Sequence, residues 1–557
     1  MKIQSLLILI TFFSIPNLNL AQVPDTLSFA TTTYQVSMRD NVTLATNVLS
    51  PKENKHSFPV IFLRTPYGKE YECKMRAHYT NQGYIVVVQD CRGTGGSKGT
   101  FEPYLHEKED GYDALDWISK QSWCNGNVGM IGASYEGQVQ WLAAASGHSV
   151  LKTIIPQVAG TDPFLDVLYD HGILKLSMIE WAYKLSFPER KPPEYILDKL
   201  YTLPVSKIDD EFFGIDIPLW NSWIKMDNPS DWIKARFLDD MKDVNIPVLN
   251  VSGNWDVEAL STQTNWLKMQ SYNKTNQHLL FGPWEHTNFL NALPTKFSGI
   301  EYGEKSKLDF ESIWLRWFDH WLKGIDNGIE KERNVQFFVT GLNTWLSMEK
   351  WPDKTFKQRE YFFNFSVSLN GFYKLDNKIT LGQTEGYDYF PDKARMNEDP
   401  EFSESSYYIR DINAKDDIAL ISDPFLKDEI LGGPTVLKIK FSIDQSDVDL
   451  FVIIAEVDSS GNISVLSHPG KMRAPFMDNK NITPIEPGKY YNATIDLFPI
   501  AHQFKKGSKL AVIIRSDWFP RYIRNPGTTD PLSNNSTIRN VKVKISSETR
   551  LVMNTIE

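Results

Sequence analysis

The stretch Asn127–Gly137, which reads NVGMIGASYEG, decides how this chain folds. Its short apolar run over 128–131 predicts a buried strand, and the small residues that follow indicate a turn at Ser134. The next residues, Tyr135–Ala145, read YEGQVQWLAAA and are expected to form a helix. A serine held on a sharp bend between a strand and a helix start, where backbone N–H groups stabilise negative charge, meets the requirements of a nucleophile elbow.

The spacing in this stretch is Gly-x-Ser-x-x-Gly, so it matches only the first half of the plain Gly-x-Ser-x-Gly motif. A strand, a turn and a helix with an incidental serine would give the same local pattern. Other segments therefore have to decide whether Ser134 is a nucleophile.

Length and composition indicate a multidomain globular protein. The chain has 557 residues, which is too many for one hydrophobic core and implies two or three domains. Hydrophobic residues make up 41% and charged residues 23%, as in ordinary folded proteins. The net charge is −10 and no basic patch is visible, which argues against nucleic-acid binding.

The first residues have the pattern of a secretory signal peptide. They combine Lys2, an apolar run over Leu6–Ile15 and a small residue at Ala21. We expect residues 1–21 to be removed and the protein to be secreted or periplasmic. No other segment approaches the length of a transmembrane span, so no membrane span is expected.

Residues that could bind metals or cofactors form no recognisable motif. The cysteines Cys73, Cys91 and Cys124 allow at most one disulfide, and their spacing is not that of a zinc site. No HExxH pattern occurs. The glycines of Arg92–Gly99 (RGTGGSKG) fit neither a dinucleotide loop nor a P-loop and indicate a turn. We therefore predict neither a metal nor a cofactor.

Strands alternate with helices in the first part of the chain. Thr33–Met38 and Val42–Leu49 predict a hairpin, and the runs Pro59–Leu63 and Tyr84–Gln89 predict buried strands. A helix is expected over His106–Gln121. Because the later strands are continuous in Val and Ile, they predict a parallel sheet with helices on both faces.

The pattern changes twice further along the chain. Residues 161–235 are aromatic and helical, which predicts a cap over the carboxyl ends of the strands. Strand patterns return at Ile246–Ser252 and His278–Phe281, and a helix is expected over Ser312–Lys323. From about Val335 the chain is rich in strand patterns, which suggests an all-β sandwich or jelly roll.

Two of these strand ends carry the residue types that would activate Ser134. The strand at Ile246–Ser252 leads to Asp256, and the strand at His278–Phe281 leads to His286. Alone, Asp256 could be a helix N-cap and His286 a loop histidine. Together they give the order Ser, Asp, His that α/β hydrolases have, each residue at a strand end.

At this point the chain resembles the X-Pro dipeptidyl-peptidase-like superfamily, which also contains cocaine-esterase-like enzymes, glutaryl acylases and α-amino-acid ester hydrolases. The matching stretches are MRDNVTLATNVLSP (38–51), LRTPYGK (63–69), GYIVVVQDCRGTGGSKGTF (83–101), WCNGNVGMIGASYEG (123–137), VSGNWD (251–256), GPWEH (282–286) and SDWFPRYIRNP (516–526). The Gly-x-Ser-Tyr-x-Gly elbow is this family's own variant.

The resemblance implies a fold and a set of roles. The fold is an α/β-hydrolase core over 22–160 and 236–350, a helical cap over 161–235, and a C-terminal all-β jelly-roll domain over 351–557. The implied roles are Ser134 as nucleophile, His286 as general base and acid, Asp256 as its orienting carboxylate, and the Tyr67 hydroxyl and Tyr135 N–H as oxyanion donors.

Three acids could bind the substrate. The ester hydrolases of the family hold the ammonium group of the substrate with a carboxylate cluster, and Glu258 falls where one member of it lies. Ala259 takes the place of a second acid, and Asp162 or Asp166 matches the third only loosely. Glu136 is a further candidate. A solvated or capping glutamate is the alternative for Glu258 and Glu136.

These observations predict a secreted serine hydrolase that cleaves small ester or amide substrates of acyl or aminoacyl type, or short peptides, through a covalent acyl-enzyme. The alternative activity is an X-Pro dipeptidyl-peptidase that releases N-terminal dipeptides. A catalytically dead hydrolase that acts as a binding module is the non-enzymatic alternative. The β-rich part could be a carbohydrate-binding module, although the match at 516–526 favours its integration with the catalytic part.

Overall fold

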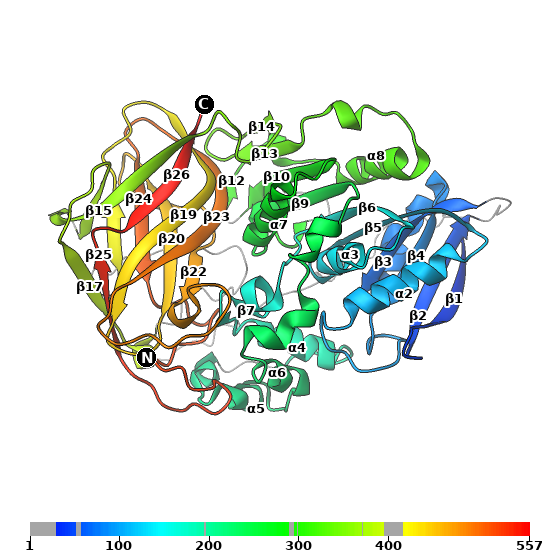
Figure 1. Cartoon of the computed structure of the whole chain (residues 1–557), viewed down its shortest axis with the longest axis horizontal. Coiled ribbons are helices and arrows are strands. Elements are labelled where there is room, and N and C mark those ends of the chain that lie inside the picture. The colour runs from blue at the N-terminus through cyan, green and yellow to red at the C-terminus, as the bar shows by residue number, and fades with distance from the viewer. Residues whose placement is uncertain are drawn as a thin grey trace, which may run out of the picture.

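The computed structural model describes residues 29–51, 57–193, 197–288, 294–297, 299–369, 371–394 and 416–557. The predicted signal peptide, residues 1–21, lies outside the described residues. Figure 1 shows an α/β part, coloured blue to green, beside a β-rich part, coloured yellow-green to red.

The α/β part is built on a ten-stranded sheet. Its strands, in order across the sheet, are β1 (Phe29–Ser37), β2 (Thr43–Pro51), β4 (Ile85–Asp90), β3 (Phe58–Thr65), β5 (Cys124–Ala133), β6 (Leu151–Gln157), β9 (Val248–Trp255), β10 (Gln277–Glu285), β13 (Val335–Val339) and β14 (Thr344–Met348). The strands from β4 to β13 are parallel, and β1, β2 and β14 add antiparallel edges. The predicted hairpin and parallel sheet are thus present.

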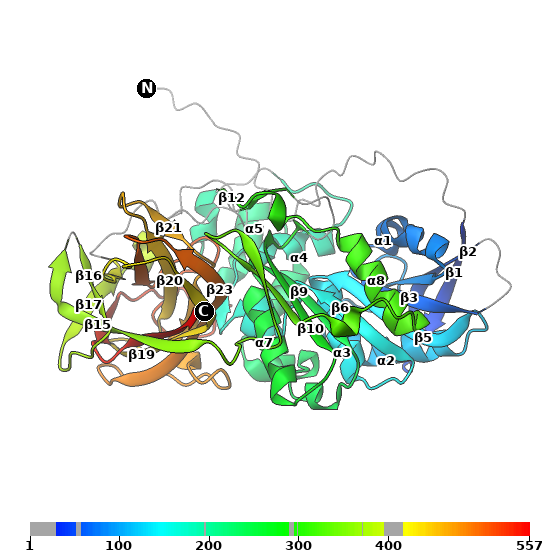
Figure 2. The ribbon, with the colours of Figure 1, turned by 90° about the horizontal axis from the view of Figure 1, so that it is seen from above.

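Helices cover both faces of this sheet (Figure 2). Because neighbouring strand residues point to opposite faces, Phe62 of β3 packs on one side and Leu63 on the other. The first side carries α2 (Glu107–Ser119) and α3 (Tyr135–Ala145), and the second carries α1 (Lys69–Arg76) and α8 (Phe310–Lys323). Helix α7 (Ala259–Ser271) follows β9 and packs in a third cluster with Leu279 of β10.

The segment predicted as a cap is helical and aromatic. It contains α4 (Met178–Ser186), α5 (Ile208–Phe213) and α6 (Pro218–Trp223), together with short helical turns and a two-residue ladder of β7 (Tyr169–Asp170) and β8 (Ile173–Leu174). The sequence pattern did not predict that ladder. Trp220, Trp223 and Trp232 of this segment are fully buried in the same apolar cluster as α2 and α3.

The β-rich part forms a curved twelve-stranded sheet around its own apolar core. Its strands are β15 (Lys357–Leu369), β16 (Phe372–Asp376), β17 (Thr384–Tyr389), β18 (Ile418–Ile421), β19 (Glu429–Ile443), β20 (Asp449–Val457), β21 (Ile463–Val465), β22 (Gly470–Arg473), β23 (Tyr491–Phe504), β24 (Lys509–Arg515), β25 (Val541–Ser546) and β26 (Arg550–Ile556). Leu437, Val512 and Leu551 are central members of that core.

The two parts share an apolar and a charged contact. Phe498 and Ile556 of the β-rich part pack in one cluster with Leu279 and Val335 of the α/β sheet. Asp170 of the cap accepts hydrogen bonds from Lys471 and from the hydroxyl of Tyr522, both in the β-rich part, the latter at 2.8 Å. The β-rich part is therefore joined to the cap as well as to the sheet.

Two further properties concern the whole described chain. Cys73, Cys91 and Cys124 are all free thiols, so none of them forms the single disulfide that the sequence allowed. None of the helices within the described ranges is long and apolar enough to cross a membrane.

Candidate active site

Four predicted site residues follow the carboxyl ends of strands in the central sheet. Ser134 comes directly after β5, Asp256 directly after β9 and His286 directly after β10, while Tyr67 lies two residues beyond β3. Because these strands are parallel, their carboxyl ends lie at one edge of the sheet, where open α/β sheets bind ligands.

Ser134 is held in a strained backbone conformation. Its φ is 61° and its ψ is −123°, values that cost a non-glycine residue about 1–3 kcal/mol. The turn also requires residues without a Cβ at positions 132 and 137. A Cβ on Gly132 would lie 2.5 Å from the Cβ of Glu136, and one on Gly137 would lie 2.7 Å from the carbonyl oxygen of Gln157. The local sequence thus presents Ser134 at the start of α3, as a nucleophile elbow does.

His286 and Asp256 form a buried pair. The ring Nδ1 of His286 lies 2.7 Å from Oδ1 of Asp256. That carboxylate also accepts the backbone N–H of Glu258 at Oδ1, at 3.0 Å, and the hydroxyl of Ser252 at Oδ2. Because these donors fix the carboxylate, it holds the imidazole with Nδ1–H toward Asp256 and leaves Nε2 as the basic nitrogen.

Ser134, His286 and Tyr67 meet at one cavity. Its other lining residues are Tyr104, Val167, Lys175, Ser177, Met178, Trp181, Val257, Glu258 and Arg521. Tyr104 comes from the segment between β4 and α2, Val257 and Glu258 directly precede α7, Arg521 comes from the β-rich part, and the others come from the cap. The cavity is therefore assembled by all parts of the described chain, and its walls are mostly apolar with a few charged groups.

Tyr67 lines the same cavity as Ser134. Burial, followed by the charge of Glu136, raises the pKa of its phenol. Although 38% of the residue surface is exposed, the hydroxyl end remains protonated at neutral pH. An O–H that stays protonated beside a nucleophile can donate to a developing oxyanion.

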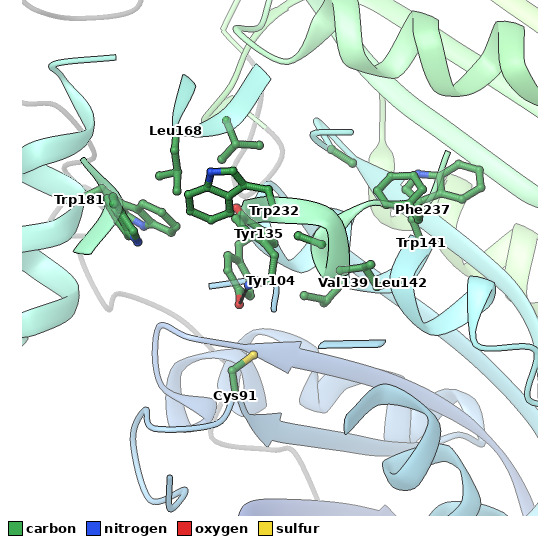
Figure 3. Close-up of a cluster of buried hydrophobic side chains, with 14 of the residues drawn as sticks. Cys91, Tyr104, Tyr135, Val139, Trp141, Leu142, Leu168, Trp181, Trp232 and Phe237 are labelled. Atoms are coloured by element: carbon green, nitrogen blue, oxygen red, sulfur yellow. Dashed lines mark hydrogen bonds between the residues drawn. The ribbon is translucent and has the colours of Figure 1, made fainter. Parts of the chain in front are cut away.

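Tyr135 contributes its backbone rather than its side chain. Its N–H lies in the first turn of α3, where helix N–H groups have no partner within the helix. Its ring turns into the protein, where it stacks on Tyr104 at 4.3 Å, and its hydroxyl donates to Glu107 at 2.7 Å. Figure 3 shows this ring close to Trp232 of the cap, with Trp181 to its left.

Of the three acids proposed for substrate binding, Glu258 lines the cavity. Its Oε1 lies 3.7 Å from Nζ of Lys175, and burial raises its pKa. Asp166 lies behind it, outside the lining, and accepts the backbone N–H of Thr161 at 3.0 Å. Burial, followed by the charge of Glu258, raises the pKa of Asp166 to about 7.

Glu136 does not reach the cavity lining. Its exposed fraction is 4%, and burial, followed by the charge of Glu72, raises its pKa well above the usual range. The structure thus separates Glu136 from the other substrate-binding candidates and places it behind the elbow.

Sequence reasoning missed two cations of the cavity, Lys175 and Arg521. Lys175 is 4% exposed, donates to the backbone carbonyl of Asp166 and lies 3.6 Å from Asp170. No motif marks it, because it follows a two-residue strand in the cap. Arg521 lies within the stretch SDWFPRYIRNP, so the resemblance pointed to its segment but not to this role.

The arrangement has the parts needed for acyl transfer. A serine and an imidazole paired with a carboxylate line one cavity together with a phenol that stays protonated. Such a set can form and break an acyl bond at the serine without another reactive group.

Two family models match the chain in succession. The model described as X-Pro dipeptidyl-peptidase (S15 family) matches residues 40–288. The model described as X-Pro dipeptidyl-peptidase C-terminal non-catalytic domain matches residues 327–552. The second match starts before β13, although β13 and β14 belong to the sheet of the α/β part.

Individual proteins show the same likeness. The cocaine esterase of Rhodococcus sp. (strain MB1 Bresler) is 26% identical, over 88% of this chain and 92% of that protein. A putative Xaa-Pro dipeptidyl-peptidase of Bacillus anthracis is also 26% identical, over 82% of this chain and 73% of that protein. A selenomethionine-labelled α-amino acid ester hydrolase structure superposes with a TM-score of 0.79 and 19% identity, covering 98% of this chain and 100% of the other.

The superposition on the α-amino acid ester hydrolase structure supports the fold. The family models and the relatives support the class of chemistry. The chain has the α/β-hydrolase fold with a β-rich C-terminal domain. It belongs to the X-Pro dipeptidyl-peptidase-like and cocaine-esterase-like superfamily and is a serine hydrolase of the S15 type.

Proposed function

We propose that this protein hydrolyses ester or amide bonds of small acyl or aminoacyl substrates, with Ser134 as nucleophile and a covalent acyl-enzyme as intermediate. The observation that carries this proposal is that Ser134 and the Asp256-paired His286 line one cavity together with Tyr67. The strained elbow at Ser134 supports it as well.

The first half of the reaction forms the acyl-enzyme. Nε2 of His286 takes the Ser134 hydroxyl proton as Oγ attacks the substrate carbonyl carbon. The tetrahedral oxyanion receives hydrogen bonds from the Tyr67 hydroxyl and the Tyr135 N–H. His286 then gives the proton to the leaving alcohol or amine as its bond to the carbonyl carbon breaks.

The second half returns the free enzyme. A water molecule takes the position of the leaving group, and His286 removes its proton as the water attacks the acyl carbon. The second tetrahedral intermediate uses the same two donors. Ser134 leaves with the proton from His286, and the carboxylic acid product is released. Asp256 stabilises the imidazolium in both halves through its bond to Nδ1.

The charged groups of the cavity set the expected substrate preference. Glu258 can bind a substrate ammonium group, but Lys175 lies 3.7 Å from its Oε1 and offsets part of its charge. Because the two ammonium groups would compete for one carboxylate, we expect a modest preference for substrates that carry a free α-amino group. The aromatic walls from Tyr104 and Trp181 suit an apolar acyl group.

Two measurements test the activity. A fluorophosphonate probe should label the wild-type protein at Ser134 and leave Ser134→Ala unlabelled. An aminoacyl ester should have a kcat/KM several-fold above that of its des-amino analogue. A folded wild-type protein that the probe does not modify would contradict the hydrolase mechanism and favour a binding module, whereas equal kcat/KM values would remove the amine preference alone.

An X-Pro dipeptidyl-peptidase is the second candidate, favoured by the S15 family match and by Glu258 in the cavity. That reaction also has to anchor an N-terminal amine. A dipeptidyl-proline amide substrate, measured beside the aminoacyl ester, distinguishes the two: a higher kcat/KM for the dipeptidyl-proline amide would favour the peptidase.

We also propose export, on the grounds of the Lys2, Leu6–Ile15 and Ala21 pattern. Expression of the full chain in a bacterial host should yield a periplasmic or extracellular protein whose first residue is Gln22. An unprocessed N-terminus in the mature protein would contradict this proposal.

A further inference from the structure

Four charged side chains form an alternating series between the β-rich part and the cavity. Lys471 of β22 donates a hydrogen bond to Oδ2 of Asp170 in the cap, and Nζ of Lys175 lies 3.6 Å from that same oxygen. Nζ of Lys175 also lies 3.7 Å from Oε1 of Glu258, which lines the cavity. Each of the four residues is at most 7% exposed. A series of cation, carboxylate, cation and carboxylate therefore runs through the interior and ends at the cavity.

Lys175 is shared almost equally between two carboxylates. Its Nζ donates to the backbone carbonyl of Asp166 and lies at nearly the same distance from Asp170 as from Glu258. Although burial lowers the pKa of Lys175, the charges of Glu258 and Asp170 raise it above its ordinary value. Lys175 therefore stays a cation, and a buried cation needs a carboxylate beside it.

A substrate ammonium group at Glu258 would place two cations beside one carboxylate. Because like charges repel, the ammonium group of the protein has to be compensated elsewhere if the substrate is to bind well. Asp170 lies on the other side of Lys175. Although burial opposes its ionisation, the charges of Lys471 and Lys175 lower the pKa of Asp170 to about 2. Asp170 is thus ionised at neutral pH and can compensate Lys175 while Glu258 accepts a substrate.

Lys471 competes with Lys175 for Asp170. Both ammonium groups approach Oδ2, and the hydroxyl of Tyr522 donates to the same oxygen at 2.8 Å. Burial lowers the pKa of Lys471 to about 8, so most of it is still protonated at neutral pH. Since each cation at this oxygen reduces the attraction that the carboxylate exerts on the other, Lys471 weakens the attraction between Asp170 and Lys175.

Backbone contacts join the cap to the β-rich part at the same place. The N–H of Ser177 donates to the carbonyl of Arg521, and the N–H of Ile523 donates to the carbonyl of Leu174, both at 3.2 Å. An antiparallel bridge lies between these two bonds. The attachment of the cap therefore does not depend on the charged side chains alone.

We propose that Asp170 is a positioning residue that attracts Lys175 away from Glu258 and so lets that glutamate bind a substrate ammonium group. Lys471 limits this attraction, so the β-rich part influences substrate selection through a residue that does not line the cavity. The inference rests on the proposed function, because it assumes that Glu258 binds a free α-amino group. Arg521 also lines the cavity, but its charge is the same in every variant of the test.

The proposal predicts opposite effects for two substitutions. The measured quantity is the ratio of kcat/KM for an aminoacyl ester to kcat/KM for its des-amino analogue. Asp170→Asn leaves Lys175 with Glu258 as its counter-charge and should lower the ratio by about three- to tenfold. Lys471→Met strengthens the attraction between Asp170 and Lys175 and should raise the ratio by about two- to fivefold. Mere damage to the contact between the cap and the β-rich part would change the ratio in the same direction in both variants.

A double-mutant cycle tests whether Lys175 transmits the effect. In the Lys175→Met background, Asp170→Asn and Lys471→Met should each change the ratio by less than about 1.5-fold. Lys440→Met is the matched control, because Lys440 of β19 also pairs with a carboxylate of the β-rich part, Glu548 at 2.6 Å, but is not part of the series. It should leave the ratio unchanged, and melting temperatures check the folding of every variant.

Glu258→Gln separates the inference from the proposed function. If Glu258→Gln leaves the ratio unchanged, or if the wild type hydrolyses neither ester, the inference and the part of the proposed function on which it rests are overturned together. If Glu258→Gln lowers the ratio but Asp170→Asn does not, or if Asp170→Asn lowers it equally in the Lys175→Met background, the inference alone is overturned. Should Asp170→Asn fail to fold, an unchanged or lower ratio in Lys471→Met would overturn the inference.

Discussion

The Nδ1 atom of His286 lies 2.7 Å from Oδ1 of Asp256, in a pair whose two residues are 6% and 0% exposed. The carboxylate carries two further donors, from Ser252 and from the Glu258 backbone. The Asp256 carboxylate thus accepts hydrogen bonds from three donors. That property gives the sharpest prediction for the site.

Asp256→Asn should lower kcat by about 10⁴. An amide has one acceptor and one donor, so it cannot accept from His286, Ser252 and Glu258 at once, and it favours the imidazole tautomer with the wrong nitrogen protonated. Steady-state kinetics and the rate of fluorophosphonate labelling would measure the effect, with the melting temperature as a check on folding. Activity within tenfold of wild type would show that Asp256 does not orient the base.

Tyr67→Phe should lower kcat by about 10²–10³ and leave KM within about threefold, because the lost O–H acts in the transition state rather than in substrate binding. Tyr71→Phe is the matched control. The Tyr71 hydroxyl is also buried, but it is not part of the cavity lining, so its loss should leave kcat unchanged. A rise in KM alone for Tyr67→Phe would assign that hydroxyl to substrate binding.

The positions of Ser134, Asp256 and His286 could be predicted because each follows a strand that the apolar pattern marks. Helix α3 even has the bounds predicted for it, Tyr135–Ala145. Strand β9 extends three residues beyond the predicted end at Ser252, and it stops directly before Asp256. The local sequence is thus sufficient to predict where these strands end. Because the strands are parallel, the side chains that follow them lie at one edge of the sheet.

The walls of the cavity could not be predicted in the same way. Lys175 reaches the cavity from the cap, and Arg521 reaches it from a segment more than 300 residues later in the chain. Neither has a local pattern, because their positions depend on how the cap and the β-rich part pack. Glu136 shows the same limit: it lies two residues after Ser134, but the helical turn directs its side chain behind the elbow and away from the cavity lining.

Glu258→Gln should reduce the ratio of kcat/KM for an aminoacyl ester to that for its des-amino analogue. We expect a reduction of at most about tenfold, equivalent to about 1.4 kcal/mol, because Lys175 already offsets part of the carboxylate charge. Lys175→Met should change the ratio in the opposite direction, since it frees Glu258 for a substrate ammonium group. If the ratio stays constant in both variants, the pair has no role in amine recognition.

Asp166 should make the folded protein less stable as the pH rises. Its pKa in the folded protein is about 7, mainly because of burial, whereas that of an unfolded Asp is about 4. Between these two values the unfolded chain releases the proton and the folded chain keeps it, so the stability contributed by the protonated form is lost as the pH rises through about 7. The melting temperature of Asp166→Asn minus that of wild type should therefore increase from pH 5 to pH 8. A pH-independent difference would show that Asp166 has an ordinary pKa.

Removal of residues 351–557 should give an insoluble or inactive protein. The truncation exposes Leu279 and Val335, which pack in one cluster with Phe498 and Ile556, and it takes Arg521 out of the cavity. It also removes the two donors, Lys471 and the Tyr522 hydroxyl, that Asp170 of the cap accepts. Gel filtration and hydrolysis of the aminoacyl ester measure the outcome. A soluble truncated protein with wild-type kcat/KM would instead identify the β-rich part as an independent module, such as one that binds carbohydrate, and it would remove Arg521 from the residues needed for the reaction.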